Sequence, residues 1–199
     1  MKIRKLFKFE GAHIVRNCSS EHCKYNIHGH SYRVEIFLSS NKLDKGYMVV
    51  DFILLDKIKE FIESFDHSYS LWDREADEFK EFIYRYNSRV AEIPVSPSAE
   101  GYALMFYFVA YKIISNTIFK NGEGNIKLEA VRVHETATGY AEVSEEDRHL
   151  MDFTLDNILF SPGICEDWKV ESWWQNLKDK KLFINPDVEI NLPFNKYNN

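Results

Sequence analysis

The feature that most constrains the fold is a run of alternating residues that begins with His28, Gly29 and His30. From Tyr32 to Ile36, bulky apolar residues occupy every second position and charged residues fill the positions between them. A period of two is typical of a β-strand with one buried face. Because residues i and i+2 of a strand point to the same side, we expect His28 and His30 to present two imidazoles side by side.

A third imidazole is available from the N-terminal segment. Residues 2–13 form another strand-like run rich in Phe, Ile and Leu, and His13 closes it. Three neutral imidazoles suit Zn²⁺, which with three protein ligands keeps a fourth position open for water or substrate. A closed structural site needs a fourth ligand, which Cys18, Cys23 or His22 could supply. Spacing alone leaves catalytic zinc, structural zinc and no metal as alternatives.

The remaining pattern predicts an α+β domain. The expected order is strand, strand, helix, helix, strand, strand, over residues 2–13, 30–39, 52–65, 97–119, 126–134 and 140–144. The first helix has apolar residues at helical spacing, and the second, which we expect Ser96 to cap, is apolar almost all round. Tight connections within each strand pair favour an antiparallel four-stranded sheet with both helices on one face.

Two segments lie outside this pattern. Residues 72–92 are highly charged with interspersed aromatic side chains, and we interpret them as an insertion that holds a short helix. Residues 145–199 hold three of the four tryptophans on an expected short helix, followed by a tail rich in Pro and Asn. We therefore expect one domain over residues 1–144 and a C-terminal extension, 145–199, packed on it.

Composition narrows the class of function. The 199 residues carry a net charge of −6, so we expect no basic face and no nucleic-acid partner. The N-terminal segment lacks the apolar run of a signal peptide, and no stretch approaches the ~20 apolar residues that span a membrane. Three cysteines without an export signal indicate reduced thiols, and we expect a cytoplasmic protein.

Two cysteines and one acid–imidazole pair carry side chains suited to proton transfer. Cys23 and Cys18 lie in the polar loop between the first two strands, and a thiol there is either a base, activated by a nearby cation, or a packed residue. Asp66 and His67 end the first helix. Such a pair either takes part in catalysis or is merely solvated.

Two glutamates are candidates for substrate binding. By alternation, Glu135 lies on the same face as the apolar residues Val131 and Val133. A carboxylate on a buried face needs a partner, which the amidine-like edge of a ligand would provide. Glu100 lies in the first turn of the second helix, where an acidic residue favours the helix dipole.

Together these residues resemble the 6-pyruvoyl-tetrahydropterin synthase / 6-carboxytetrahydropterin synthase family. Each matching segment is short, and the specificity comes from their joint occurrence in family order over about residues 2–144. The segments are Phe9-Glu10-Gly11-Ala12-His13, the loop around Cys23, His28-Gly29-His30-Ser31-Tyr32, Gly46 to Phe52, Asp66-His67, Pro97-Ser98-Ala99-Glu100 and Val133 to Glu142.

The resemblance implies the tunnelling fold, whose units associate through their sheets into a barrel, as a trimer or as a hexamer of two stacked trimers. It also implies a role for each residue singled out above. The roles are Zn²⁺ binding by His13, His28 and His30, general-base catalysis by Cys23, partnership with that base by Asp66 and His67 of a neighbouring subunit, and pterin binding by Glu135, with Glu100 assisting.

The implied substrate is 7,8-dihydroneopterin triphosphate. One branch of the family eliminates triphosphate and stops at a 6-pyruvoyl product, whereas the other releases acetaldehyde and makes 6-carboxytetrahydropterin for queuosine and other deazapurines. The short loop between the cysteines and histidines favours the second branch. The alternatives are pyruvoyl formation, aldolase-type cleavage to a hydroxymethylpterin, and a non-enzymatic zinc-binding assembly module. Within the loop, Cys18 competes with Cys23 for the role of base.

Overall fold

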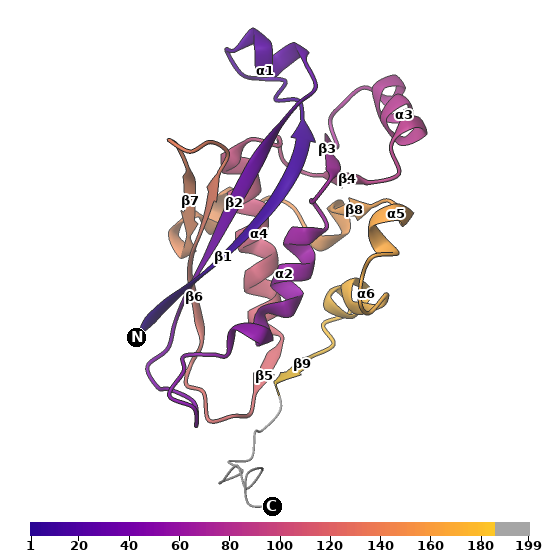
Figure 1. Ribbon diagram of the computed structural model, residues 1–199. Helices are drawn as coiled ribbons and strands as arrows, with labels where there is room; N and C mark the ends of the chain where they lie inside the picture. The colour runs from indigo at the N-terminus through magenta and orange to yellow at the C-terminus, as the bar shows by residue number, and fades with distance from the viewer. Residues whose placement is uncertain (186–199) are drawn as a thin grey trace, which may run out of the picture.

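The computed structural model describes residues 1–185. The tail rich in Pro and Asn lies outside these described residues. A mixed sheet of seven strands, in the order β7-β6-β2-β1-β3-β4-β8, forms its centre (Figure 1). The strands are β1 (Lys2–His13), β2 (His28–Ser39), β3 (Ser68–Trp72), β4 (Val90–Ile93), β6 (Lys127–His134), β7 (Ala141–Ser144) and β8 (Leu159–Phe160), with β5 (Thr117–Phe119) and β9 (Phe183–Asn185) in a separate parallel pair.

Within residues 1–185, six α-helices and three short 3₁₀ helices connect or flank these strands. One lies between β1 and β2, four lie between β2 and β6, and the rest follow β7. They are α1 (Glu21–Tyr25), η1 (Phe52–Leu55), α2 (Asp56–Glu63), α3 (Asp77–Tyr86), α4 (Ala99–Ser115), η2 (Glu145–Leu150), η3 (Leu155–Asn157), α5 (Pro162–Cys165) and α6 (Trp173–Lys178). Among the residues described, none of these helices combines the length and the apolar character needed to cross a membrane.

The long antiparallel half of the sheet confirms the strands expected from alternation. β1 and β2 pair without interruption, from Lys2 opposite Ser39 to His13 opposite His28, and β6 and β7 follow antiparallel on the β2 side. Every second residue of β2 from Tyr32 onwards is buried. These side chains share one apolar core with α2 and α4, so both expected helices cover the same face (Figure 1).

The expected four-stranded antiparallel sheet is wrong, because three further strands extend it beyond β1. β3 pairs parallel with the end of β1, β4 pairs parallel with β3, and β8 from the C-terminal segment pairs antiparallel with β4. The segment interpreted as an insertion therefore contributes to the sheet. These strands have two to five residues, too few for a period of two to stand out from the surrounding charged sequence.

The opposite face of β3 and β4 is covered by α3, the short helix expected within residues 72–92. Ile83 of α3 packs against Tyr69, Leu71 and Val90 in an apolar cluster distinct from the main core. The loop expected between the first two strands likewise contains the short helix α1. Each insertion is thus anchored to the sheet near the end at which β1 finishes (Figure 1).

The start of α4 differs from the expected position in a way that matters for the site. Ser98, and not Ser96, caps the helix, and its hydroxyl accepts a hydrogen bond from the backbone N–H of Gly101 at 3.2 Å. The helix therefore begins at Ala99. Pro97 stays outside the helix, and its carbonyl oxygen is turned toward His13.

Residues 145–185 pack on the helix-covered side of the molecule. η2 lies against α4, the ring of Phe153 meets that of Phe108 with centroids 5.1 Å apart, and β9 pairs with β5. α6 carries Trp173 and Trp174 as expected, whereas Trp168 precedes this helix. The ring of Trp174 stacks on that of Phe61 in α2, with centroids 5.5 Å apart. Large aromatic surfaces such as these contribute strongly to packing, so the segment is held by an apolar interface as well as by polar contacts.

Candidate metal centre and active site

Three histidines converge at one end of the antiparallel half of the sheet. His13 ends β1 directly opposite His28, and His30 lies two residues further along the same face of β2. One ring nitrogen from each histidine lies within 4.8 Å of the other two, and the Nε2 atoms of His13 and His28 are 3.1 Å apart. Two nitrogens bound tetrahedrally to one zinc ion lie about 3.3 Å from each other, so this spacing suits a shared ion.

Backbone carbonyls orient two of these rings. His13 Nδ1 lies 2.5 Å from the carbonyl oxygen of Pro97, and His28 Nδ1 lies 2.9 Å from that of Asn26. Because a carbonyl accepts a hydrogen bond, each Nδ1 carries the proton and each Nε2 turns its lone pair into the cluster. Burial lowers the pKa of His13 to about 4 against the effect of the Pro97 hydrogen bond, so this ring is neutral at neutral pH.

The donor set fits an open metal site. Among residues 1–185, the three histidines are the one group of His, Cys, Asp or Glu side chains placed to share an ion. Neither loop cysteine belongs to this group, and the thiol of Cys18 instead donates to the carbonyl of Ser20 at 3.3 Å. A three-nitrogen set without a fourth protein ligand is typical of catalytic zinc and not of structural zinc.

Glu135 reaches this cluster from the residue after β6, on the face that the alternation predicted. The pairing of β6 with β2 places it beside Tyr32, whose hydroxyl donates to Glu135 Oε1 at 3.4 Å. The same oxygen lies 3.7 Å from His13 Nε2 and 4.0 Å from His30 Nε2. With 30% of its side chain exposed, this carboxylate can also bind the paired donors of a ligand.

Aromatic rings form the base of the site, and the sequence interpretation gave them no role. The ring of Tyr32 stacks on Phe9 with centroids 4.6 Å apart and meets Tyr102 edge-on at 5.1 Å. Burial raises the pKa of Tyr32 and of Tyr102, so both hydroxyls stay neutral. Tyr32 has the same parity as His28 and His30, and that signal could have placed it in the site.

The two loop cysteines lie in different surroundings. Cys23 is half-buried in α1, and its carbonyl accepts the backbone N–H of Val15 at 3.0 Å, which ties this helix to the end of β1. The Cys23 thiol is also among the neighbours that, after burial, raise the pKa of the Tyr32 hydroxyl. The Cys18 thiol is held by its own loop. The structure therefore ties the helix of Cys23 to β1, next to His13, and gives Cys18 a partner within its own loop.

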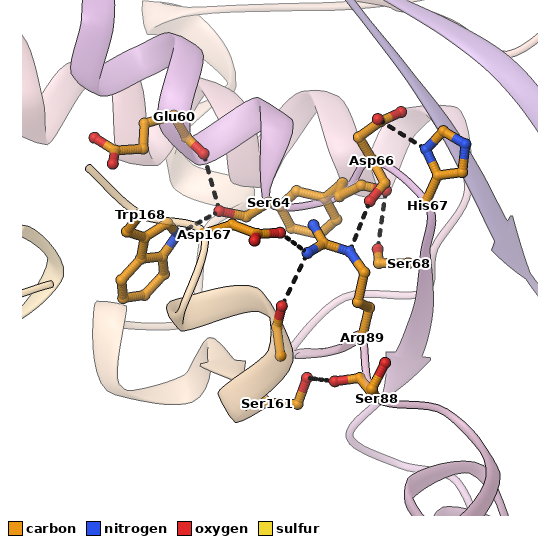
Figure 2. A network of polar contacts seen from close by, with 12 residues as sticks. Glu60, Ser64, Asp66, His67, Ser68, Ser88, Arg89, Ser161, Asp167 and Trp168 are labelled. Carbon is orange, nitrogen blue, oxygen red and sulfur yellow. Dashed lines mark hydrogen bonds and ion pairs between the residues drawn. The ribbon is translucent and has the colours of Figure 1, made fainter. Parts of the chain in front are cut away.

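Asp66 and His67 form the turn between α2 and β3 (Figure 2). Although they are adjacent, His67 Nδ1 lies 2.8 Å from Asp66 Oδ2, and Asp66 Oδ1 accepts the backbone N–H of Glu10 at 2.8 Å. Burial acts to raise the pKa of Asp66, but the Glu10 N–H, the His67 ring and Arg89 hold it below its usual value. The carboxylate is therefore ionised and orients the imidazole, 75% of which is exposed.

The acid–imidazole pair lies apart from the histidine cluster. The His67 backbone pairs with Glu10, three residues before His13, which corresponds to about 10 Å along β1. A cleft of about 640 Å³ bordered by α3 is lined by His67 and by one histidine of the cluster, His30. The structure thus joins the three histidines with Glu135 and leaves this pair at the edge. Glu100 is exposed on the first turn of α4.

A mixed sheet with two covering helices thus carries, at one end, three histidines that could hold a metal ion, an arrangement typical of an enzyme. The model of the 6-pyruvoyl tetrahydropterin synthase family matches residues 2–146, and the chain belongs to that family. A 6-carboxy-5,6,7,8-tetrahydropterin synthase from Helicobacter pylori (strain J99) is 42% identical over 191 residues, which cover 92% of this chain and 96% of the relative. That alignment extends well beyond the part that the family model matches.

More distant relatives match a smaller share of the chain. A 6-carboxy-5,6,7,8-tetrahydropterin synthase from Aquifex aeolicus is 30% identical over 73% of this chain and 98% of its own length. An uncharacterised protein from Wolinella succinogenes is 19% identical, with a TM-score of 0.56 over 73% of this chain and 98% of its own. A 6-pyruvoyl tetrahydropterin synthase from Plasmodium vivax is 18% identical, with a TM-score of 0.50 over 72% and 97% of the two chains. Both structural matches show the same fold.

Proposed function

We propose that this protein is a zinc-dependent 6-carboxy-5,6,7,8-tetrahydropterin synthase, a carbon–oxygen lyase acting in queuosine and deazapurine biosynthesis. It converts 7,8-dihydroneopterin triphosphate to 6-carboxy-5,6,7,8-tetrahydropterin and releases acetaldehyde and triphosphate. The observation that carries the proposal is the convergence of three imidazoles beside the Glu135 carboxylate. The Helicobacter pylori relative with this activity in its name aligns with nearly the whole chain, and this favours the 6-carboxy over the 6-pyruvoyl product.

In this proposal Glu135 and the histidines bind different parts of the substrate. The two carboxylate oxygens of Glu135 accept paired N–H groups from the amidine-like edge of the pterin and fix its orientation. His13, His28 and His30 hold zinc, which when bound supplies Lewis acidity to the side-chain oxygens of the substrate and so acidifies the neighbouring C–H group. Glu100 assists at the mouth of the pterin site.

Cys23, Asp66 and His67 move the proton in this proposal. Cys23, which is half-buried in α1, acts as the general base and accepts the proton of the acidified C–H group. Asp66 orients the His67 ring through its bond to Nδ1, so that the opposite nitrogen exchanges a proton with the base. The exposure of this ring is the reason to place it against a neighbouring copy of the chain.

Product analysis tests the reaction directly. The zinc-loaded protein is incubated with 7,8-dihydroneopterin triphosphate, and the pterin product and any two-carbon fragment are identified by mass spectrometry. A 6-carboxy product together with acetaldehyde is the expected result. A 6-pyruvoyl or hydroxymethyl product would assign the protein to a different pterin reaction, and absence of turnover would favour the non-enzymatic assembly module.

Mixing two inactive variants tests whether the site is shared between copies in a homo-oligomer, a trimer or a hexamer. Cys23→Ala and His67→Ala protein are unfolded and refolded together in equal amounts. If each site takes Cys23 from one copy and His67 from another, about a quarter of the sites regain both residues and about a quarter of the wild-type activity returns. If both residues act within one chain, the mixture stays inactive.

A further inference from the structure

Arg89 connects the acid–imidazole turn to a part of the chain far away in sequence. It lies between α3 and β4, and its guanidinium donates from Nε to the carbonyl oxygen of Asp66 at 3.1 Å (Figure 2). From Nη1 it donates to the carbonyl of Gly163 at 2.9 Å and to the carboxylate of Asp167. A planar guanidinium can bridge three acceptors in fixed directions, which a lysine cannot do.

The turn that Arg89 contacts has an unfavourable backbone geometry. His67 has a φ of 52°, in the left-handed region that residues with a side chain rarely adopt. Such a conformation persists where surrounding contacts enforce it. Here the His67 N–H donates to the Glu10 carbonyl at 2.6 Å, and the Ser68 hydroxyl donates to the Phe65 carbonyl at 2.9 Å.

The segment that contains Gly163 and Asp167 binds both the end of α2, which leads into this turn, and the loop that carries Arg89. On one side the indole of Trp168 donates to the Ser64 hydroxyl at the end of α2, at 2.9 Å. On the other side the Ser161 hydroxyl donates to the Ser88 carbonyl at 2.6 Å (Figure 2). The approach is close, because a Cβ added to Gly163 would lie 2.5 Å from the Ser88 carbonyl oxygen.

We infer that Arg89 is a positioning residue, which couples the docking of residues 161–169 to the placement of the His67 ring. The inference rests on the proposed proton-transfer role of Asp66 and His67. Arg89 holds the Asp66 carbonyl, and the C-terminal segment holds Arg89, so the turn keeps its left-handed residue only while this segment is docked. A segment outside the matched family core thereby contributes to the catalytic geometry.

The test compares Arg89→Gln and Arg89→Lys with the wild type in the full-length, zinc-loaded protein. Without substrate, amide hydrogen exchange at His67 is expected to rise at least about tenfold in both variants, with exchange at Val34 in β2 unchanged. With substrate, kcat is expected to fall about 10- to 100-fold at a KM within about twofold, because a small misplacement of a catalytic group slows the chemical step. Full recovery by Arg89→Lys would overturn the inference, since charge alone would then suffice.

Gly163→Ala tests the docking of residues 161–169 while leaving the Arg89 side chain unchanged. Its added methyl group meets the Ser88 backbone and displaces the segment while Arg89 stays intact, so the same loss of protection at His67 is expected. Arg148→Gln is the matched control. It also removes a guanidinium, which is paired with Glu145 at 2.7 Å, but this pair does not contact the turn. The substitution should therefore change neither readout.

The exchange measurement keeps this inference separate from the proposed reaction, because it requires no turnover. Unchanged exchange at His67 in folded Arg89→Gln and Gly163→Ala protein would refute the inference even if the 6-carboxy product forms. Increased exchange without formation of that product would support the bridge and reject the reaction. Should Arg89→Gln fail to fold, Asp167→Asn removes only the largely exposed carboxylate and serves for the same comparison.

Discussion

The histidine cluster and the Asp66–His67 turn are built in opposite ways. The cluster lies on the helix-covered face, where His13 is fully buried and carbonyls of Pro97 and Asn26 orient the rings from behind. The turn lies at the edge of β1, with most of the His67 ring in solvent and a strained backbone held by neighbouring segments.

This difference indicates that one chain alone assembles the histidine cluster, whereas the exposed His67 ring still lacks the surroundings of a catalytic group. One chain brings three imidazole nitrogens together so that they could hold an ion, and it places the Glu135 carboxylate within 4.0 Å of His13 and His30. A solvent-exposed imidazole exchanges protons with water and becomes selective only when something covers it. The cluster should therefore respond to substitution as a binding centre, and the turn as a device for moving a proton.

Loss of a metal ligand should give the largest effect. In His30→Ala the cluster retains two nitrogens, and we expect bound zinc to fall below one-tenth of the wild-type content and activity to fall by at least about 10⁴-fold. Metal analysis and turnover measure the two effects. Treating the wild type with a chelator should reproduce the loss of activity. Added Zn²⁺ should restore activity to the chelated wild type but not to His30→Ala. Full activity in metal-free protein would refute the metal-centre assignment.

Removal of the base should leave the metal centre intact. Cys23→Ala is expected to retain zinc and to lose about 10²- to 10⁴-fold in kcat, the usual contribution of a positioned base. Cys18→Ala, whose thiol contacts only its own loop at Ser20, is the matched control and should keep both zinc and activity. An inactive Cys18→Ala protein beside an active Cys23→Ala protein would reverse the assignment.

Neutralising the ligand-binding carboxylate should have a smaller effect. Glu135→Gln keeps the shape but replaces a charged acceptor, which costs about 1.5–3 kcal/mol and corresponds to roughly 10- to 150-fold in kcat/KM. Zinc content should not change. Binding of a pterin without the triphosphate side chain, followed by fluorescence, should weaken by a similar factor. Unaltered pterin binding would show that Glu135 does not hold this edge.

The histidine cluster could be predicted from sequence because it follows from parity. His28 and His30 lie on one strand face, and pairing with β1 brings His13 opposite to them. Glu135 was placed by the same alternation. The carbonyl of Pro97 could not be predicted in this way, because it depends on where α4 begins, and a backbone acceptor leaves no residue-specific signal.

The half of the sheet beyond β1 could not be predicted for a different reason. The parallel pairing of β3 with β1 joins residues more than 50 positions apart. β3 and its parallel neighbour β4 are also too short to show a pattern. The contacts of Arg89 reach across a further 74 residues to Gly163. Local sequence carries no record of such a contact, so the support behind the turn appears only in the folded chain.

The smallest expected effect concerns the stability that the turn gains from Asp66. Its folded pKa is below the ordinary carboxyl value, because contacts with the Glu10 N–H, His67 and Arg89 outweigh burial. These contacts therefore stabilise the fold above a pH of about 3.9, and their contribution is lost as the pH falls through the lower folded value. With 40% of the side chain exposed, Asp66→Asn should cost less than about 1 kcal/mol at pH 7.

Urea unfolding of metal-free wild-type and Asp66→Asn protein between pH 7 and pH 3 measures this contribution. The difference between the two free energies of unfolding should be constant down to about pH 4 and should shrink below it. Removing the metal keeps protonation of the three histidines the same in both proteins. A difference that grows as the pH falls would mean that Asp66 is protonated in the folded state, and the carboxylate could not then orient His67 as an anion.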